Sequence, residues 1–331
     1  MTSIRWGIAG LGAMASLLAQ DLALVPNAEL VAVASRSLPK AEEFAARHGV
    51  PRPLGSYRAL LEDPAIDAIH IATPHSLHCD LALAAIEHGK AVLVEKAFTA
   101  THTGAVTLVE AARRNRVFAM EGMWTRFQPA IVELRKRIRA GAIGTPLTIQ
   151  ADLMARRQFA ETDRLFAREL AGGALLDLGC YPVSLAQHFL GDVSAIDCQA
   201  RHYANGADSA ATINLRHGNG GLSALSIGFD AHGPGRFAIY GTAGWVEILP
   251  RFHHPTTVLL HRPDAEPETI SRPPLGLGYS HELIEVSERV LAGDTESATM
   301  PLDDTLEVMR VLDECARQIG VHHTEQTAPL D

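Results

Sequence analysis

The chain has 331 residues, of which 47% are hydrophobic and 20% charged, and its formal net charge at pH 7 is -9. This length accommodates two domains, each with its own core. The acidic balance argues against nucleic-acid and anionic-membrane partners, since both need a basic face, and no apolar run approaches the length of a membrane span. Because no basic and apolar leader precedes the first strand, we expect a cytoplasmic protein that acts on small molecules.

The first predicted element is a strand that begins at Ile4 and leads into a G-x-G-x-x-A turn and a helix. Gly10 allows a tight turn, Gly12 lets the backbone approach a pyrophosphate, and the small Ala15 lets the helix pack closely on the strand. The N–H groups at the helix N-terminus then face the phosphates. We predict a dinucleotide site formed by Gly10, Leu11, Gly12, Ala13 and Met14. Apolar residues at helical spacing follow at Met14, Leu17, Leu18, Leu22 and Val25.

The second predicted strand, Glu29 to Ser35, ends at the position that distinguishes the two nicotinamide cofactors. NAD sites usually have an acidic residue here, which binds the ribose hydroxyls and would repel a 2′-phosphate. This chain has Ser35-Arg36, and Lys40 follows one helical turn later. Arg36 can pair with a phosphate and Ser35 can donate a hydrogen bond, so the pattern favours NADP over NAD. The alternative is that Arg36 is a solvated side chain at a strand end.

Strands and helices continue to alternate through the first half of the chain. Further strands are predicted at Asp67–Ala72, 91–96 and Val117–Met120, and helices at Pro39–His48, Ser56–Leu61, the segment from His78 to Gly89, and Thr101–Arg114. In a doubly wound parallel sheet, ligands bind outside the carboxyl ends of the strands. We therefore expect Gly10, Arg36, Thr73 and Lys96 to face one crevice.

Several motifs occur in a fixed order along the chain. They are the G-x-G-x-x-A turn, Ser35-Arg36, Thr73-Pro74-His75-x-x-His78, Glu95-Lys96, Gly122-Met-Trp-Thr-Arg-Phe127 and Gly172-Gly-Ala-Leu-Leu-Asp-Leu-Gly-Cys-Tyr-Pro182. In this order they resemble the Gfo/Idh/MocA oxidoreductases, and most of all the branch with dimeric dihydrodiol dehydrogenases and NADP-dependent D-xylose dehydrogenases. One departure is Ala97, where the family commonly has proline after the lysine, so the turn lacks a fixed φ.

The resemblance implies an α/β protein in two parts. An N-terminal Rossmann domain with a doubly wound parallel sheet is expected over residues 1–122. An α+β domain with an open, mostly antiparallel sheet is expected over residues 123–331. That second sheet is often used for dimerisation in the family, so we expect a homo-oligomer, a dimer or tetramer, formed through it.

The pattern in the second half agrees with such a sheet, because strands follow one another without long helices between them. They are predicted at Leu147–Met154, Val193–Tyr203, Ser209–Arg216, Leu222–Phe229, Arg236–Tyr240, Trp245–Leu249 and Thr257–His261. Helices are predicted at Arg126–Ala140, Tyr279–Leu291 and Leu302–Ile319. The Pro-rich segment Arg262–Gly278 is interpreted as a loop.

Hydride transfer requires the protein to orient a substrate and to move one proton. The resemblance implies that Lys96 lies beside the nicotinamide and that Tyr181 is an acid or base. An ammonium close to a phenol lowers the pKa of the phenol. Asp177 precedes Tyr181 by four residues, so on a helix it shares that face and is predicted to orient Lys96 or a substrate hydroxyl, although Pro182 would kink or break the helix. Whether Tyr181 or a water passes the proton stays open.

The remaining candidates come from position along the chain or from the family pattern. Cofactor contacts are predicted at Thr73, Pro74, His75, His78, Glu95, Lys96, Trp124 and Arg126. Substrate contacts are predicted at His78, Lys96, Trp124, Arg156, Arg157, Asp177, Tyr181 and Tyr279. No third ligand accompanies His75 and His78, so we predict no metal site. The other histidines, including His253-His254 and His322-His323, are interpreted as surface residues without a chemical role.

These observations favour an NADP-dependent oxidoreductase that acts on a secondary alcohol, hemiacetal or carbonyl of a sugar, polyol or cyclic dihydrodiol. Two alternatives stay open. One is an NAD-dependent glycoside hydrolase with a transient redox cycle, and the other is a non-catalytic regulator that senses NADP. The presence of Lys96, Asp177 and Tyr181 argues against the regulator.

Overall fold

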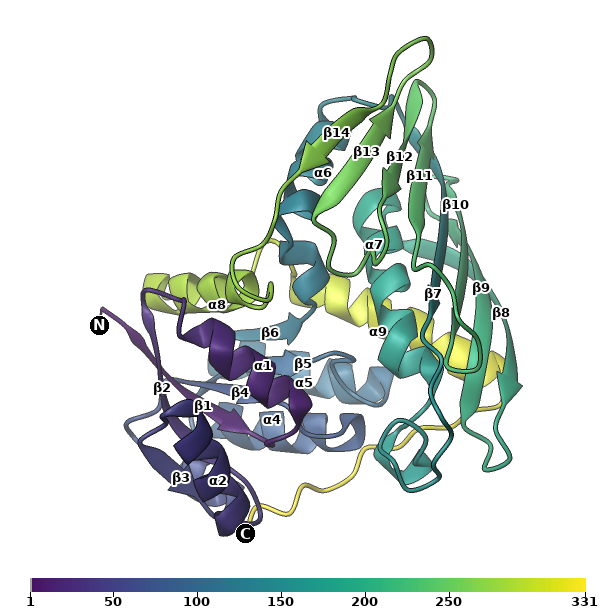
Figure 1. The fold of residues 1–331 in the computed structure, drawn as a ribbon. Helices are drawn as coiled ribbons and strands as arrows, with labels where there is room; N and C mark the ends of the chain where they lie inside the picture. The colour runs from purple at the N-terminus through teal and green to yellow at the C-terminus, as the bar shows by residue number, and fades with distance from the viewer. Residues whose placement is uncertain (1) are drawn as a thin grey trace. The chain divides into compact units, whose positions relative to one another are not determined.

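The computed structural model describes residues 2–331, which form two compact units (Figure 1). The first unit contains residues 2–123, Leu275–Thr305 and Thr324–Asp331, and the second contains Trp124–Pro274 and Leu306–His323. The sequence-based division at residue 122 lies beside the first crossing between the units. The division does not account for Leu275–Thr305 and Thr324–Asp331, which belong to the first unit although they follow Pro274 in the chain.

The first unit is built on a six-stranded sheet of order β3-β2-β1-β4-β5-β6 in which every strand pair is parallel. The strands are β1 (Ile4–Ala9), β2 (Ala28–Ala34), β3 (Arg52–Leu54), β4 (Ala68–Ile71), β5 (Ala91–Glu95) and β6 (Ala119–Gly122). The strand order reverses between β1 and β4, which is where ligands bind in doubly wound sheets. Strand β3 was not predicted, because a three-residue edge strand that contains Pro53 has almost no strand pattern.

Helices cover this sheet, and this is why β5 is a continuous apolar run with all five residues buried. They are α1 (Ala13–Leu22), α2 (Leu38–His48), α3 (Tyr57–Leu61), α4 (His78–Glu87), α5 (His102–Asn115) and α8 (Ser280–Ala292). Helix α1 packs beside α2 and α8, and α4 packs beside α5. The buried side of α1 consists of Ala15, Leu18, Ala19, Asp21 and Leu22, whereas the predicted Met14 and Leu17 are partly exposed.

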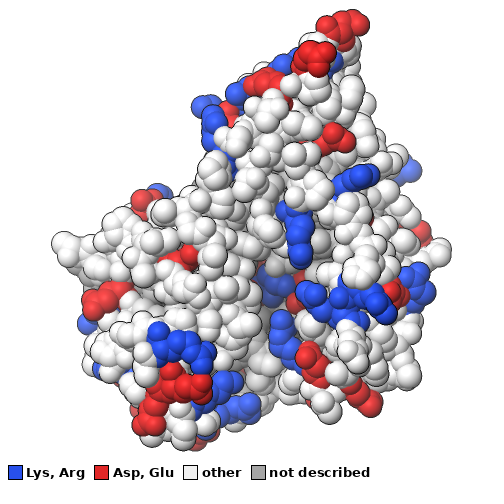
Figure 2. Space-filling model, viewed as in Figure 1, with Lys and Arg blue, Asp and Glu red and all other residues white. Residues whose placement is uncertain are grey.

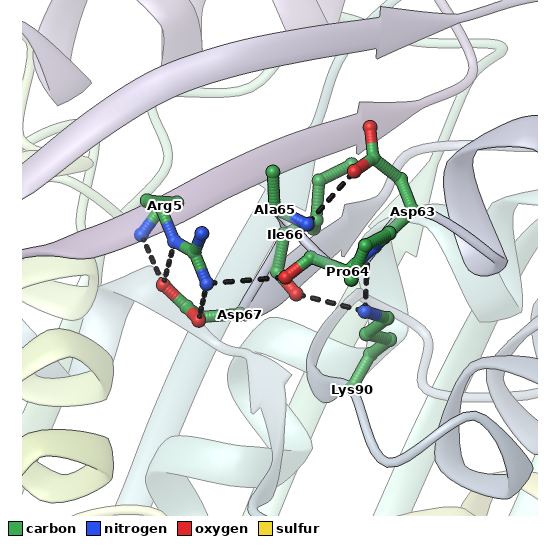
Figure 3. Close-up of polar contacts among 7 residues, drawn as sticks. All are labelled: Arg5, Asp63, Pro64, Ala65, Ile66, Asp67 and Lys90. Carbon is green, nitrogen blue, oxygen red and sulfur yellow. Dashed lines mark hydrogen bonds and ion pairs between the residues drawn. The ribbon is translucent and has the colours of Figure 1, made fainter.

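A polar network fixes the amino ends of three strands of the first sheet (Figure 3). The guanidinium of Arg5 donates to the carboxylate of Asp67 at 2.7 and 2.9 Å. The ammonium of Lys90 donates to the carbonyl oxygens of Asp63 and Ile66 at 2.6 and 2.9 Å. Because these groups lie where the strands begin, they hold the sheet together at the edge away from the carboxyl ends.

The second unit is built on an eight-stranded sheet of order β14-β13-β12-β11-β7-β10-β9-β8. Its strands are β7 (Pro146–Met154), β8 (Val193–His202), β9 (Asp208–His217), β10 (Leu222–Gly228), β11 (Phe237–Gly241), β12 (Gly244–Ile248), β13 (Thr257–His261) and β14 (Glu268–Ser271). Only the pair β7–β10 is parallel, so the predicted mostly antiparallel sheet is confirmed. The interpretation of Arg262–Gly278 as a loop was wrong for β14, where Ile270 is the one buried residue of a four-residue edge strand.

The helices of the second unit are α6 (Pro129–Arg139), α7 (Cys180–Leu190) and most of α9 (Leu302–Gln318). The predicted helix Arg126–Ala140 begins later, after a short 3-10 turn at Trp124–Phe127, since Gln128 is extended before Pro129. Helix α7 packs on β7 and β10. Within residues 2–331, no helix combines the length and the apolar character that a bilayer crossing requires.

Candidate functional site

The glycine turn after β1 leaves room for a ligand at the N-terminus of α1. Gly10 has φ +91°, and a Cβ there would lie 2.8 Å from the carbonyl oxygen of Ala72, so a side chain is excluded. Gly12 is the N-cap of α1, no side chain caps the helix there, and a Cβ on Gly12 would meet nothing within 4 Å. The first N–H groups of α1 therefore face open space, as a pyrophosphate requires.

A cavity of about 290 Å³ lies between this turn and α2. Its lining residues are Leu11, Gly12, Ala13, Ser16, Lys40, Glu43, Phe44 and Arg47. Figure 2 shows basic and acidic side chains next to one another at the lower left, over α2. Arg47 pairs with Glu43 at 2.6 Å, and Lys40 extends from the first turn of the helix.

The end of β2 carries the residues predicted to select the cofactor. Ser35 is buried, and its hydroxyl oxygen accepts the N–H of Ser37 at 3.3 Å, which leaves its own hydrogen to donate. Arg36 is exposed, and residues 35–40 contain no acidic side chain. Open backbone at α1, a hydroxyl donor and two basic groups fit a dinucleotide that carries an additional phosphate.

The turn after β4 is a 3-10 segment, His75–Leu77, that leads directly into α4. Within residues 2–331, the buried hydroxyl oxygen of Thr73 has no hydrogen-bond partner. The ring of His75 is buried and lies edge-on to the ring of His78, with centroids 5.7 Å apart. Thr73 and His75 thus stand at the carboxyl end of β4, beside the glycine turn that follows β1.

His78 has a different position from the one predicted. Its ring is fully buried, with Nδ1 3.0 Å from the carbonyl oxygen of Ala97 and Nε2 2.8 Å from that of Thr73. Burial lowers the pKa of His78, although the two carbonyl groups oppose this change. Both ring nitrogens contact backbone carbonyl oxygens, and contact of His78 with cofactor or substrate stays a prediction. His78 instead connects two turns of the candidate site.

Glu95 and Lys96 end β5. The carboxylate of Glu95 lies 3.1 Å from Nε2 of His70, and both side chains are buried. Burial would raise the pKa of Glu95, but the hydrogen bond with His70 and the charge of Lys96 outweigh it, so the pKa is lowered. A negative charge is therefore held beside the Lys96 ammonium. The Lys96–Ala97 peptide bond is cis.

Tyr279 belongs to the first unit, where it lies beside the glycine turn. Its hydroxyl is 3.9 Å from Sδ of Met14, and its N–H donates to Asp21 at 2.8 Å. The buried Asp21 also accepts the N–H groups of Leu277 and Ser280. One carboxylate of α1 thus fixes the segment that enters α8, a function that the sequence analysis did not predict.

The prediction that Arg126 contacts a ligand is not supported by its position in the second unit. The side chain is fully buried and donates to the hydroxyl and carbonyl oxygens of Ser184 at 2.8 and 3.1 Å, and to Gln187 at 2.8 Å. A buried guanidinium requires such partners, and Arg126 finds them on α7. Its role is to attach the Trp124–Phe127 turn to that helix.

Asp177 and Tyr181 lie on consecutive turns of one helical segment. Residues Leu175–Gly179 form a π-helical turn, and α7 continues from Cys180. Pro182 neither breaks nor ends the helix, because the π-helical turn directly before it accommodates the backbone hydrogen bond that proline cannot make. Asp177 lies 3.8 Å from the guanidinium of Arg164, and Tyr181 is 8% exposed.

Two histidines that were predicted to lie at the surface belong to an aromatic cluster, and one of them, His253, packs against Tyr181. The ring of His253, which is 8% exposed, lies 5.1 Å from the Tyr181 ring, and the ring of His254 is 4.4 Å from that of His253. Trp124 contacts both, at centroid distances of 6.1 and 5.5 Å. The surface interpretation was therefore wrong for His253, whose neighbour Phe252 is fully buried and anchors the segment. His323 is also partly buried, whereas His322 is exposed.

Arg156 and Arg157 are exposed in the segment after β7, where the N–H of Arg157 bonds to the carbonyl oxygen of Phe229. Their guanidinium groups face solvent, so their selection as substrate contacts stays a prediction.

The first sheet gathers at one end the strands that lead to four predicted site residues, whereas a crevice shared by these residues stays a prediction. Gly10, Arg36, Thr73 and Lys96 follow the carboxyl ends of β1, β2, β4 and β5, which are adjacent parallel strands. In the second unit the structure brings Trp124 and Tyr181 together around His253.

Comparison with known proteins gives a consistent result. Residues 4–123 match an oxidoreductase family with an NAD-binding Rossmann fold, and residues 131–247 match the GFO/IDH/MocA C-terminal domain. A trans-1,2-dihydrobenzene-1,2-diol dehydrogenase from Xenopus laevis is 33% identical over 329 residues, which cover 96% of this chain and 98% of the relative. An NADP-dependent D-xylose 1-dehydrogenase from Hypocrea jecorina is 32% identical over 367 residues, which cover 98% and 94%.

Among solved structures, KijD10, a 3-ketoreductase from Actinomadura kijaniata in complex with NADP and TDP-benzene, superposes with a TM-score of 0.86. It is 25% identical, and the match covers 96% of this chain and 98% of that chain.

Proposed function

The chain belongs to the Gfo/Idh/MocA family of oxidoreductases, and from this premise we propose that it transfers a hydride between NADP and a carbon of a sugar, polyol or cyclic dihydrodiol. The reacting group is a secondary alcohol or hemiacetal in one direction and a carbonyl in the other. The nicotinamide supplies or accepts the hydride when the cofactor is bound. Relatives that cover nearly the whole chain and act on a dihydrodiol and on xylose support this substrate class.

The residues that follow β2 are the main reason to propose NADP and not NAD as the cofactor. Ser35 and Arg36 stand where an NAD site has a carboxylate, and Lys40 lies on the cavity beside the glycine turn. Basic groups and a hydroxyl donor suit a 2′-phosphate, which an acidic residue would repel.

Lys96 and Tyr181 are the residues to which we assign the proton. Lys96 follows Glu95, and the charge of Lys96 is one of the causes that lower the pKa of this carboxyl, so an ionised carboxylate lies near the lysine. Tyr181 is mostly buried, and its ring packs against His253. We assign Asp177, on the preceding turn, to the orientation of Lys96 or of a substrate hydroxyl.

The proposal is tested by mixing the purified protein with NADP or NAD and a panel of aldoses, inositols and dihydrodiols, and by following the absorbance of the reduced nicotinamide. Lys96→Met is the active-site variant, and Lys136→Met, at an exposed position on α6, is the control for loss of a lysine. We expect turnover with NADP that Lys96→Met abolishes, while NADP still binds that variant with a similar Kd.

Two results would contradict the proposal. Full activity of Lys96→Met would remove Lys96 from the chemistry. Cleavage of a glycoside without net change in reduced nicotinamide would replace hydride transfer with a hydrolytic cycle.

The exposed face of the second sheet supports self-association. Leu222, Tyr240 and Trp245 are 50%, 38% and 38% exposed on it, and a depression of about 670 Å³ is lined by residues of β7 and β9 to β12. Large apolar side chains that gather on one sheet face often mark an interface. We propose a homo-oligomer through this face in a cytoplasmic protein. Light scattering on the wild type and on Trp245→Glu tests it, and a monomeric wild type would disprove it.

A further inference from the structure

The helical segment that carries Asp177 and Tyr181 starts next to a buried carboxylate that has no role in the proposed function. Asp208 is the first residue of β9 and is 0% exposed. Its Oδ2 accepts the backbone N–H of Leu175 at 2.6 Å. Leu175 is the first residue of the π turn that contains Asp177 and leads into α7.

We propose that Asp208 is a positioning residue for the hydride-transfer reaction, acting through the helical segment that carries Asp177 and Tyr181. The first N–H groups of a helix have no partner within the helix, so an external acceptor decides how firmly that end is fixed. A carboxylate is a strong acceptor, and its charge interacts favourably with the positive end of the helix.

The chain before the helix is shaped to admit this carboxylate. Gly173 has φ +138°, and a Cβ there would lie 2.0 Å from Oδ1 of Asp208. The position thus requires glycine both for its backbone angle and for the approach of Asp208. The carbonyl oxygen of Gly173 also accepts the N–H of Asp177 at 3.4 Å, so Gly173 contacts the same turn that Asp208 holds at Leu175.

Asp208 is held in place by the sheet. It pairs with His202 across β8 and β9, at the end of a hairpin closed by the Tyr203–Ala207 hydrogen bond. Burial raises the pKa of Asp208 to about 6, and the N–H of Leu175 opposes the rise, so the group is mainly ionised above neutral pH. A rigid, charged acceptor on a sheet sets the position of the helix start, and hence the aim of Tyr181.

This inference rests on the proposed function, and two variants test it. Asp208→Ala removes the acceptor, and Asp208→Asn keeps an acceptor oxygen without the charge. Asp230→Asn is the matched control, because Asp230 also accepts hydrogen bonds in this unit, from Arg201 and Ser209, but does not contact the helix. The measurements are kcat per NADP-binding site, KM, and the Kd of NADP.

We expect Asp208→Ala to lower kcat about tenfold or more, with the Kd of NADP within twofold of wild type. Asp208→Asn restores most of that loss, and Asp230→Asn stays within twofold. A residue that serves stability alone would lower the melting temperature and leave kcat per NADP-binding site unchanged. That result in Asp208→Ala would overturn the proposal. If Asp208→Ala does not fold, Gly173→Ala pushes a methyl group onto the carboxylate and is expected to lower kcat in the same way.

Amide hydrogen exchange keeps this inference separate from the proposed function, since it needs no substrate. Amides 174–181 are expected to exchange about tenfold faster in Asp208→Ala than in the wild type, and at wild-type rates in Asp230→Asn. Unchanged exchange in Asp208→Ala would overturn the role of Asp208. Absence of turnover in the wild type, together with faster exchange in the variant, would contradict the proposed function alone.

Discussion

Nδ1 of His78 lies 3.0 Å from the carbonyl oxygen of Ala97, so the turn after β4 is connected to the residue that follows Lys96. The other ring nitrogen reaches the carbonyl oxygen of Thr73. One buried imidazole therefore holds two turns that follow adjacent strands of the sheet.

We expect His78→Leu to lower the free energy of unfolding by about 1–3 kcal/mol, because the neutral imidazole donates its one N–H to a buried carbonyl oxygen, which loses its partner in the variant. We also expect kcat to fall about tenfold, since Lys96 lies on the loosened turn. Urea unfolding and steady-state kinetics measure both effects. The control is His88→Leu at the exposed end of the same helix, where a change of less than about 0.5 kcal/mol is expected. A wild-type denaturation midpoint in His78→Leu would show that the contacts of the buried ring contribute nothing to stability.

Arg36→Ala is expected to raise KM for NADP about 10- to 100-fold, the usual loss when a charged hydrogen bond to a phosphate is removed. KM for NAD should stay within twofold, because NAD has no 2′-phosphate for Arg36 to bind. The ratio of the two KM values is the measurement. Lys136→Ala, which removes an exposed positive charge on α6, is the control and should change neither. An equal loss with both cofactors would mean that Arg36 supports the fold of this region and does not select NADP.

The sequence predicted the first sheet well, and the reason is physical. Strands such as β5 are covered on both faces, so they appear as continuous apolar runs, and Gly10 marks a turn whose backbone geometry few other residues allow. The edge strands β3 and β14 were missed, because an edge strand buries few side chains and tolerates proline and charge.

The site was predicted less completely, because several of its residues depend on partners far away in the sequence. Nothing near Arg126 shows that Ser184 and Gln187 will bury it. Nothing near Asp208 shows that a helix beginning at Leu175 will meet it. One local feature indicates that His253 is buried. The pair of histidines lies between Phe252 and Pro255, and an aromatic residue that is itself buried favours a neighbouring side chain that points inward.

Glu282 on α8 is fully buried, and burial together with the charges of Glu95, Asp21 and Glu121 raises its pKa well above the usual 4.5. A raised pKa in the folded state means that the folded protein binds the proton more tightly, so stability is lost as the pH rises above 4.5 towards the folded-state value. Glu282→Gln removes this term. We expect the variant to match the wild type near pH 5 and to be more stable by about 1–3 kcal/mol at pH 8.

The measurement for Glu282 is urea unfolding of both proteins at the two pH values. Glu288→Gln, an exposed position on the same helix, should show no such gain. A Glu282→Gln variant with the same advantage, or none, at both pH values would contradict the assignment.

His253→Ala removes the ring that packs on Tyr181 and Trp124. We expect KM for the substrate to rise about 3- to 10-fold and kcat to fall by less. Packing of this kind stabilises the bound substrate and the transition state to a similar extent, so its loss weakens binding more than it slows the chemical step. The control is His232→Ala in the segment between β10 and β11, an exposed position away from these rings. If only kcat falls, His253 acts on the proton transfer and not on binding.

Tyr181→Phe separates the two routes for the proton. The ring and its packing on His253 are kept, and only the hydroxyl is lost. If the phenol itself gives or takes the proton, kcat should fall about 10²- to 10⁴-fold, while the Kd of NADP stays within twofold. Tyr240→Phe, a tyrosine exposed on the second sheet, controls for loss of a phenol and should keep wild-type kcat. A kcat within threefold of wild type in Tyr181→Phe would mean that a water passes the proton, and Tyr181 would then serve to shape the pocket around it.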